Sequence, residues 1–139
     1  MSANLDLVRS IYAAWERGDY SHGEWAHPEI EYELVGGPTP GSWKGLAAMS
    51  EGFREWFSAW EGVSTRVDGY RTLDAERVLV LQAFRGGRGK RSGLKLADMA
   101  TECANVFHIR DGKVTKLASY WDRDDAFADL GLAADGDTG

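Results

Sequence analysis

A chain of 139 residues with 43% apolar side chains and a formal net charge of −6 is typical of one packed, acidic domain. This charge disfavours nucleic acid and anionic membranes as partners, because both bind proteins mainly through Lys and Arg. A single cysteine excludes an internal disulfide, and three scattered histidines lack the spacing of metal ligands, so we expect no metal or other cofactor.

No apolar run approaches the roughly 20 residues that span a bilayer, and the N-terminus lacks a charged leader followed by an apolar core. We therefore expect a cytoplasmic protein. A single domain is expected over residues 1–132, followed by a tail over residues 133–139 that is disordered because it has nothing to bury.

The first predicted element is an amphipathic helix over residues 4–17, because apolar side chains recur there at steps of three and four residues. Asn4 is the expected N-cap, and Gly18 is the expected stop. A short second helix is expected over residues 20–26, ended by Pro28. The apolar stripe of the first helix consists of Leu5, Val8, Ile11, Tyr12 and Trp15.

Residues 29–35 alternate between apolar and acidic side chains, which predicts a half-buried strand. An irregular but ordered loop should follow over residues 36–45, since Trp43 needs other side chains to cover it. A second main helix is predicted over residues 45–60, with one broad aromatic face.

Four antiparallel strands and a short helix should fill the rest of the chain. This order predicts an α+β domain with helices segregated to one face of a curved sheet. The strands are expected at about 64–73, 76–85, 94–109 and 113–121, and the helix at 122–130.

The last two strands form a predicted hairpin around Asp111-Gly112, because this dipeptide suits the positive φ angles of a type I′ turn. Pairing of Arg110 with Lys113 would place Asn105 opposite Ala118 and Cys103 opposite Tyr120. On this register, one face of the sheet carries Thr101, Cys103, Asn105, Phe107, Tyr120 and Asp122.

Five short segments occur in a characteristic order: AAWERGD at the end of the first helix, HPEIEY, WKG, RDGKV and YWD. Over about residues 4–132, this arrangement resembles the nuclear transport factor 2-like superfamily, and within it the SnoaL-like polyketide cyclases and their relatives. The resemblance implies a cone-shaped, curved antiparallel sheet with helices packed on its concave face, a pocket inside, and often a homodimer across the outer face. Because members range from isomerases to proteins without known activity, the fold alone does not give the reaction.

The resemblance also implies candidate catalytic residues. Ketosteroid isomerase uses a carboxylate base with a Tyr and a protonated Asp as oxyanion donors. Its base position matches Glu33, its Asp position matches Asn105, and its Tyr position falls on Ile11, one residue before Tyr12. SnoaL-type cyclases resemble this chain in having an Asp on the last strand, for which Asp122 is the candidate.

Each candidate has a structural alternative. The residues after Asp122 favour an N-cap role for it in the last helix. Glu33 alternates with the apolar side chains of its strand, so it points outward unless the strand bulges near Gly36. Asn105, on a core-facing position, must be hydrogen-bonded, either by a ligand or by a neighbouring side chain.

Two functions remain open from the sequence. One is proton transfer on a small apolar carbonyl compound, with Asp122 or Glu33 as base and Asn105 as hydrogen-bond donor. The other is a non-catalytic module that binds a small apolar ligand or only dimerises. Core packing explains the aromatic residues, and some of them are also expected to touch the ligand; these candidates are Tyr12, Trp15, Trp43, Trp56 and Tyr120.

Overall fold

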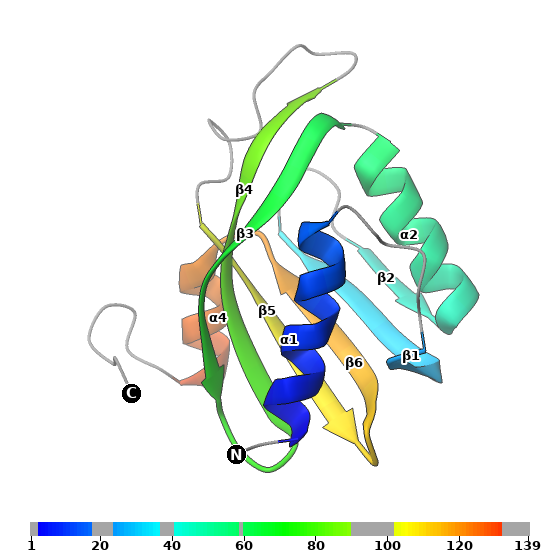
Figure 1. The fold of residues 1–139 in the computed structure, drawn as a ribbon, viewed down its shortest axis with the longest axis vertical. Coiled ribbons are helices and arrows are strands. Elements are labelled where there is room, and N and C mark those ends of the chain that lie inside the picture. The colour runs from blue at the N-terminus through cyan, green and yellow to red at the C-terminus, as the bar shows by residue number, and fades with distance from the viewer. Residues whose placement is uncertain (1–2, 18–23, 37–40, 59, 90–101, 132–139) are drawn as a thin grey trace.

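The computed structural model describes residues 3–17, 24–36, 41–58, 60–89 and 102–131, without the side chains of residues 55–58, 60–65 and 84–89. Within these ranges, a six-stranded sheet in the order β2-β1-β6-β5-β4-β3 is flanked by helices (Figure 1). The helices are α1 (Ala3–Glu16), α2 (Leu46–Ser58) and α4 (Arg123–Leu130). The strands are β1 (Ala26–Val35), β2 (Gly41–Lys44), β3 (Trp60–Thr72), β4 (Arg77–Gly89), β5 (Cys103–Arg110) and β6 (Lys113–Tyr120).

The predicted α+β class and the main helices are confirmed. Two local predictions differ from the structure. At the described end of the expected short helix, residues 24 and 25 form a turn, and Ala26 already begins β1. The expected loop contains β2, which pairs antiparallel with β1 and sets Trp43 opposite Tyr32. The predicted tail over residues 133–139 lies outside the described residues.

The sheet is mixed, whereas the sequence predicted an antiparallel one. β1 pairs with β6 in parallel, with Tyr32 beside Leu117. This is possible because α2 and the four strands β2 to β5 separate the two in sequence, and parallel neighbours need such a long connection.

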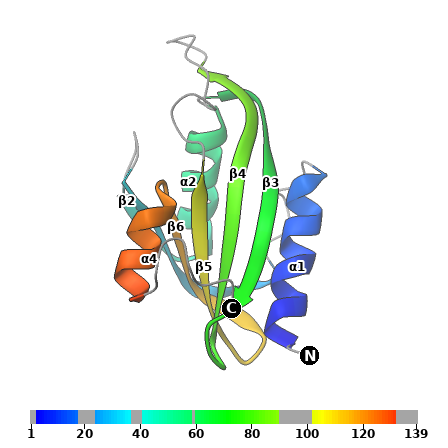
Figure 2. The same ribbon diagram turned by 90° about the vertical axis from the view of Figure 1, so that its left-hand side faces the viewer.

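The helices lie on both faces of the sheet, not on one. Figure 2 shows α1 and α4 on opposite sides. We call the face that carries α1 and α2 concave and the face that carries α4 convex. α4 packs on the convex face because it follows β6 directly and buries Ala126 and Phe127 there.

The sheet is curved, with α2 packed on β1 and β2 near one edge and leading directly into β3 at the other edge. Irregularities interrupt the pairing between Val67 and Gly69 and between His108 and Ile109, and such bulges bend and twist strands. The concave core cluster includes Val8, Ile11, Tyr12, Trp15, Ile30, Phe107 and Leu117. The convex core cluster includes Leu79, Ala104, Val106, Ala118, Ala126 and Phe127.

The β5–β6 hairpin confirms the predicted turn and corrects the predicted register. Asp111 and Gly112 both have positive φ, 52° and 76°, and Arg110 pairs with Lys113. Ile109 then pairs with Val114, but His108 pairs with Lys116, so β6 gains one residue.

This extra residue makes the predicted partners wrong beyond the turn. Asn105 lies opposite Ser119, and Tyr120 lies opposite Ala104. Because side chains alternate along a strand, a shift of one residue moves every following side chain of β6 to the other face. Tyr120 therefore belongs to the convex side, where it packs against the convex core cluster.

Candidate ligand-binding site

A buried polar triad joins α1 to the middle of the sheet. The Tyr12 hydroxyl donates a hydrogen bond to Gln82 Oε1 at 2.5 Å. The Asn105 amide nitrogen donates to the Tyr12 hydroxyl at 2.6 Å and to Gln82 Oε1 at 3.1 Å. Tyr12 is 0% exposed, Asn105 4% and Gln82 5%, so the three groups depend on one another and not on bulk water.

The local sequence explains why the triad forms. Tyr12 lies on the buried stripe of α1, and Asn105 lies between apolar neighbours on β5. Gln82 has the same orientation as Val78 and Val80, which point into the concave core. Gln82 was not among the predicted site residues, although a lone amide in the run VLVLQAF signals a buried polar group that needs a partner.

One atom of the triad has no partner. Both hydrogens of the Asn105 amide are used by Tyr12 and Gln82, while Oδ1 is buried and accepts no hydrogen bond from any described residue. With the Gln82 amide in its present orientation, turning the Asn105 amide over would set its oxygen against the Gln82 oxygen at this short range, which is repulsive. The spare capacity of the site is therefore an acceptor, not the donor that the sequence predicted for Asn105.

Neutral groups surround this acceptor. Ser119, directly opposite Asn105 on β6, hydrogen-bonds to Tyr32 of β1. Burial raises the pKa of Tyr12 well above its ordinary value, although the hydrogen bond with Asn105 lowers it in part. Burial likewise raises the pKa of Tyr32, and the bond with Ser119 opposes the change. Both phenols therefore stay protonated at neutral pH.

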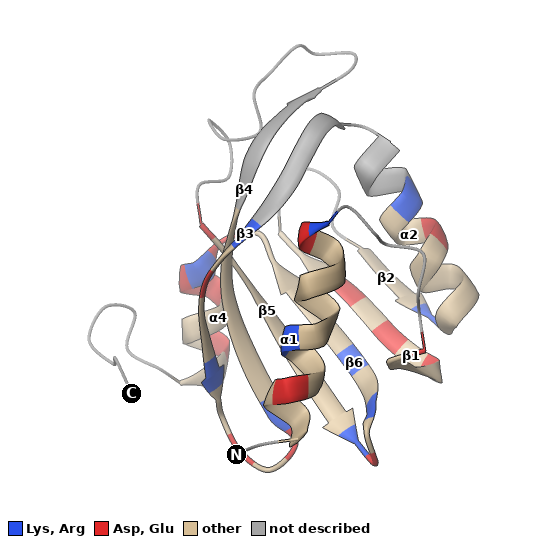
Figure 3. Cartoon of the chain, viewed as in Figure 1, with Lys and Arg blue, Asp and Glu red and all other residues tan. Residues whose placement is uncertain are grey.

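The thiol of Cys103 is also uncharged. Burial raises its pKa to about 12, and the side chain is 3% exposed. Figure 3 shows no charged residue on β5 before Arg110, at the far end of the strand. The concave surface near Asn105 can thus offer hydrogen bonds but no ionic partner from the described residues.

A continuous chain of aromatic rings lines the concave side. Tyr12 contacts Trp15 edge-on with ring centroids 4.9 Å apart, and Trp15 contacts Phe53 of α2 at 5.8 Å. Phe53 contacts Tyr32 at 4.8 Å, and Tyr32 contacts Trp43 of β2 at 5.4 Å. The structure thus places the predicted residues Tyr12, Trp15 and Trp43 on one aromatic wall.

Trp43 is held between β2 and α2. A Cβ atom on the buried Gly52 would lie 3.0 Å from the Trp43 ring, and one on Gly41 would lie 3.2 Å from it. The absence of side chains at these two positions lets the indole lie flat against α2. Trp56 lies on the same helix, but its side chain is outside the described part of the structure.

The two predicted catalytic carboxylates do not meet Asn105. Asp122 is the N-cap of α4, and its side chain accepts a hydrogen bond from the backbone N–H of Asp124 at 2.9 Å. Glu33 alternates with the concave residue Tyr32 and lies 3.9 Å from Lys116 Nζ on the convex side. The prediction that Asp122 and Tyr120 share a face with Asn105 was wrong because of the added residue in β6.

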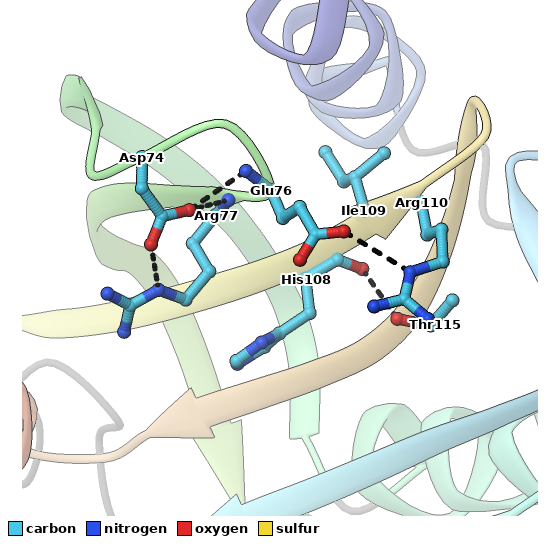
Figure 4. A pocket seen from close by; sticks show the side chains of 7 residues that line it. All are labelled: Asp74, Glu76, Arg77, His108, Ile109, Arg110 and Thr115. Carbon is cyan, nitrogen blue, oxygen red and sulfur yellow. Dashed lines mark hydrogen bonds and ion pairs between the residues drawn. The ribbon is translucent and has the colours of Figure 1, made fainter.

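Two hollows in the described part of the molecule are lined by residues outside the triad. One, of about 300 Å³, is lined by charged residues on the convex side, where Asp74 pairs with Arg77 and Glu76 pairs with Arg110 (Figure 4). His108 lies between these pairs, and burial together with the nearby Lys116 lowers its pKa. The other, of about 360 Å³, lies between α1 and the β5–β6 turn.

The described residues form no group of three His, Cys, Asp or Glu side chains suited to a metal ion. None of the helices described is long and apolar enough to cross a bilayer.

Comparisons with known proteins identify a family and a fold. The family model of the SnoaL-like domain matches residues 8–117. An NTF2-like protein from Burkholderia thailandensis superposes with a TM-score of 0.72 at 22% identity, covering 86% of this chain and 90% of that one. TerC, co-crystallised with polyporic acid, gives 0.69 at 20% identity over 93% and 98% of the two chains.

A candidate polyketide cyclase from Xanthomonas campestris gives a TM-score of 0.64 at 18% identity, covering 92% of this chain and 96% of that one. A comparison with curated protein sequences gives no match. At these identities, the solved structures show a shared fold and not a shared ligand.

Proposed function

The chain belongs to the SnoaL-like domain family, and from that premise we propose that its concave side binds a small, uncharged, largely apolar molecule with a hydroxyl group. In this proposal, the hydroxyl donates a hydrogen bond to Asn105 Oδ1. The single observation that carries it is the buried acceptor without a partner among the described residues. Buried polar groups are nearly always paired, so an exception calls for an explanation, and a ligand supplies one.

The energetic argument favours a hydroxyl donor. Leaving a buried acceptor unpaired costs about 1–3 kcal/mol, and a donor that reaches it removes this cost. Since about 1.4 kcal/mol corresponds to a factor of ten in affinity, a hydroxyl should improve binding roughly tenfold over the same molecule without one.

The absence of charge narrows the ligand class. Among the described residues, no buried side chain is charged; besides the phenols, the Cys103 thiol and the Trp15 indole, the buried polar groups are the two amides Gln82 and Asn105. A carboxylate or phosphate would lose its hydration here without gaining a counter-ion. Rings at centroid distances of 4.8–5.8 Å along the aromatic wall instead favour a flat, apolar body.

Proton transfer of the isomerase or cyclase type is the second candidate. In its favour, Tyr12 and Asn105 lie 2.6 Å apart, and ketosteroid isomerase uses a phenol and a second donor on its oxyanion; here, however, the Tyr12 hydroxyl donates to Gln82 and the Asn105 amide donates to Tyr12 and Gln82. The predicted bases Asp122 and Glu33 lie elsewhere, so binding without turnover is better supported.

Exchange of α-protons in small ketones, followed by NMR in deuterated buffer, tests this second candidate. We expect exchange at the buffer rate with the wild-type protein, Asp122→Asn and Glu33→Gln. Faster exchange that one of these two substitutions abolishes would establish proton transfer instead.

A homodimer across the convex face is also part of the proposal. α4 leaves the part of this face around His108 and Lys116 uncovered, and both side chains are only half-buried there. The mixed charges of the hollow around His108 suit a self-complementary contact. Sedimentation should give twice the chain mass of 15.3 kDa for the wild-type protein. In Lys116→Glu, the mass measured by sedimentation should fall toward that of a single chain.

Matched ligand pairs test the binding proposal. Each pair consists of a phenol with one to three rings and its methyl ether. The two molecules share the same apolar ring system, and only the phenol has a hydroxyl that can donate a hydrogen bond. Native mass spectrometry and calorimetry should show phenols bound about tenfold more tightly than their ethers, and Asn105→Leu should remove the preference. Equal affinities within every pair, or an unchanged preference in Asn105→Leu, would contradict the proposal.

A further inference from the structure

The geometry assigns a positioning role to Arg123, the first residue of α4: it fixes the two strands that carry the amides of the polar triad. This inference rests on the proposed function for its effect on binding, but not for its effect on the triad itself. Arg123 approaches from the convex side and contacts no atom of the triad's side chains in the described structure. Its influence on a ligand would therefore pass through the backbone of β4 and β5.

Arg123 makes four contacts through its guanidinium group. Nη2 donates to the backbone oxygen of Gln82 at 3.2 Å and to Asp68 Oδ2 at 3.0 Å. Nε donates to the backbone oxygen of Cys103 at 3.4 Å, and Nη1 donates to Glu102 Oε2 at 3.3 Å. The side chain is only 15% exposed, so these charge-assisted bonds are partly shielded from water.

Two of these contacts hold β4 and β5 together at the last described pair of their ladder, which we call the fork. The pair Gln82 and Cys103 is the last one described in the β4–β5 ladder, although β4 continues to Gly89 beside β3. Beyond the last pair, no ladder bond among the described residues connects β4 to β5. The guanidinium of Arg123 supplies a connection at this point by binding a carbonyl from each strand.

The same two residues determine where the triad lies. Gln82 presents its backbone oxygen to Arg123 and its side-chain oxygen to Tyr12 and Asn105. Cys103 lies two residues before Asn105 on β5, with the same orientation. Arg123 therefore fixes the spacing between the strands from which the two amides project.

Asp68 holds Arg123 in place. It lies at the irregularity between Val67 and Gly69, where β3 passes Gln82 and Leu81. Arg66 also binds Asp68, with Nε at 2.9 Å from Oδ1, but no contact links Arg66 to the fork in the described structure. The pair Arg66 and Arg123 thus offers a matched comparison: both arginines share the carboxylate of Asp68, and one of them holds the strands.

Small displacements of the strands matter because the triad's bonds are short. Hydrogen bonds of 2.5 Å and 3.1 Å to Gln82 Oε1 weaken steeply when donor and acceptor separate or tilt. A shift of β4 against β5 would move Gln82 away from Asn105 and free the amide to rotate. Oδ1 would then no longer be held in a fixed direction for a ligand hydroxyl.

The experiment compares Arg123→Gln and Arg123→Lys with Arg66→Gln as control. The first readout needs no ligand: the side-chain amide signals of Asn105 and Gln82 in ¹⁵N–¹H NMR spectra. We expect both signals to move in the Arg123 variants and to stay in place in Arg66→Gln. The second readout is affinity for 2-naphthol against 2-methoxynaphthalene, where the Arg123 variants should lose about tenfold in affinity for the phenol and most of the preference.

The outcomes separate this inference from the proposed function. Folded Arg123 variants with unmoved amide signals would overturn the positioning role. A second outcome is that the amide signals move in the Arg123 variants but the wild-type protein does not prefer 2-naphthol. This result would support the positioning role and contradict the proposed ligand class. If Arg123→Gln does not fold, the amide signals of Arg123→Lys decide the question, because lysine keeps the positive charge but lacks the planar guanidinium group that binds both carbonyls. Equal changes in Arg66→Gln would show that the ion pairs of Asp68 act only on overall stability.

Discussion

Tyr12→Phe and Asn105→Leu should change stability very differently, although both residues belong to one hydrogen-bonded triad. Tyr12→Phe removes a hydroxyl that donates to Gln82 and accepts from Asn105. Asn105→Leu removes two donated bonds as well, but it also removes the oxygen that has no described partner. The difference between the two variants therefore reports the cost of buried amide groups without a partner, of which that oxygen is the one present in the wild type.

The magnitudes follow from the bonds lost. Each bond contributes about 1 kcal/mol net, so Tyr12→Phe should lower the free energy of unfolding by about 2 kcal/mol. Gln82 and Asn105 remain bonded to each other afterwards, but one hydrogen of the buried Asn105 amide loses its acceptor, so about 2 kcal/mol is the smallest loss expected. Asn105→Leu loses about 2 kcal/mol in the same way but regains about 1–3 kcal/mol from the unpaired acceptor, which leaves a net change near zero.

Urea unfolding followed by tryptophan fluorescence measures both changes, and calorimetry should show a fall in Tm of about 7 °C for Tyr12→Phe alone. Tyr70→Phe is the matched control, because Tyr70 packs edge-on against Tyr12 at 6.1 Å and its hydroxyl lies outside the triad. A loss in Asn105→Leu as large as that in Tyr12→Phe would show that Oδ1 is already satisfied in the free protein. The ligand argument would then lose its basis.

Other substitutions test the packing and the electrostatics around the site. In Gly52→Ala the new Cβ would lie 3.0 Å from the Trp43 ring, so overpacking of about 1–3 kcal/mol opposes the gain of up to about 1 kcal/mol from Ala in α2, and urea unfolding should show a net loss of about 1 kcal/mol. Gly69→Ala, with nothing within 4 Å, should change stability by less than about 0.5 kcal/mol. Asp122→Ala should lose about 1 kcal/mol as the N-cap of α4 while leaving the phenol preference intact. Burial acts to raise the pKa of Asp68, but Arg66 and Arg123 outweigh this effect through their hydrogen bonds and charges. The pKa of Asp68 therefore lies below its ordinary value of 3.8. Stability from these pairs is therefore complete above pH 3.8 and lost as the pH falls through the lower, folded pKa, so Asp68→Asn should flatten the acid limb of a stability–pH curve.

The fold could be predicted to a large extent because its signals are local. The stripe of α1 and the Asp111-Gly112 turn each depend on residues close together in sequence. The parallel pairing of β1 with β6 and the convex position of α4 depend on contacts between distant segments, which no local pattern specifies.

The site could be predicted only in part, for a physical reason that lies in one residue. The face of each β6 side chain depends on whether the strand keeps its register, and the irregularity next to His108 moved Tyr120 away from Asn105. Asn105 itself lies on the predicted core-facing side. Tyr12, placed one position away from the matching residue of ketosteroid isomerase, nevertheless reaches Asn105. Its partner Gln82 was missed because its role depends on α1 packing against β4.

A crystal structure of the protein with the tightest-binding phenol of the matched pairs tests the central claim most directly. We expect the phenol oxygen about 2.7 Å from Asn105 Oδ1, with the ring against the aromatic wall and the bond between Tyr12 and Gln82 retained. A phenol bound in another part of the molecule, or one whose hydroxyl points away from Asn105, would contradict the account.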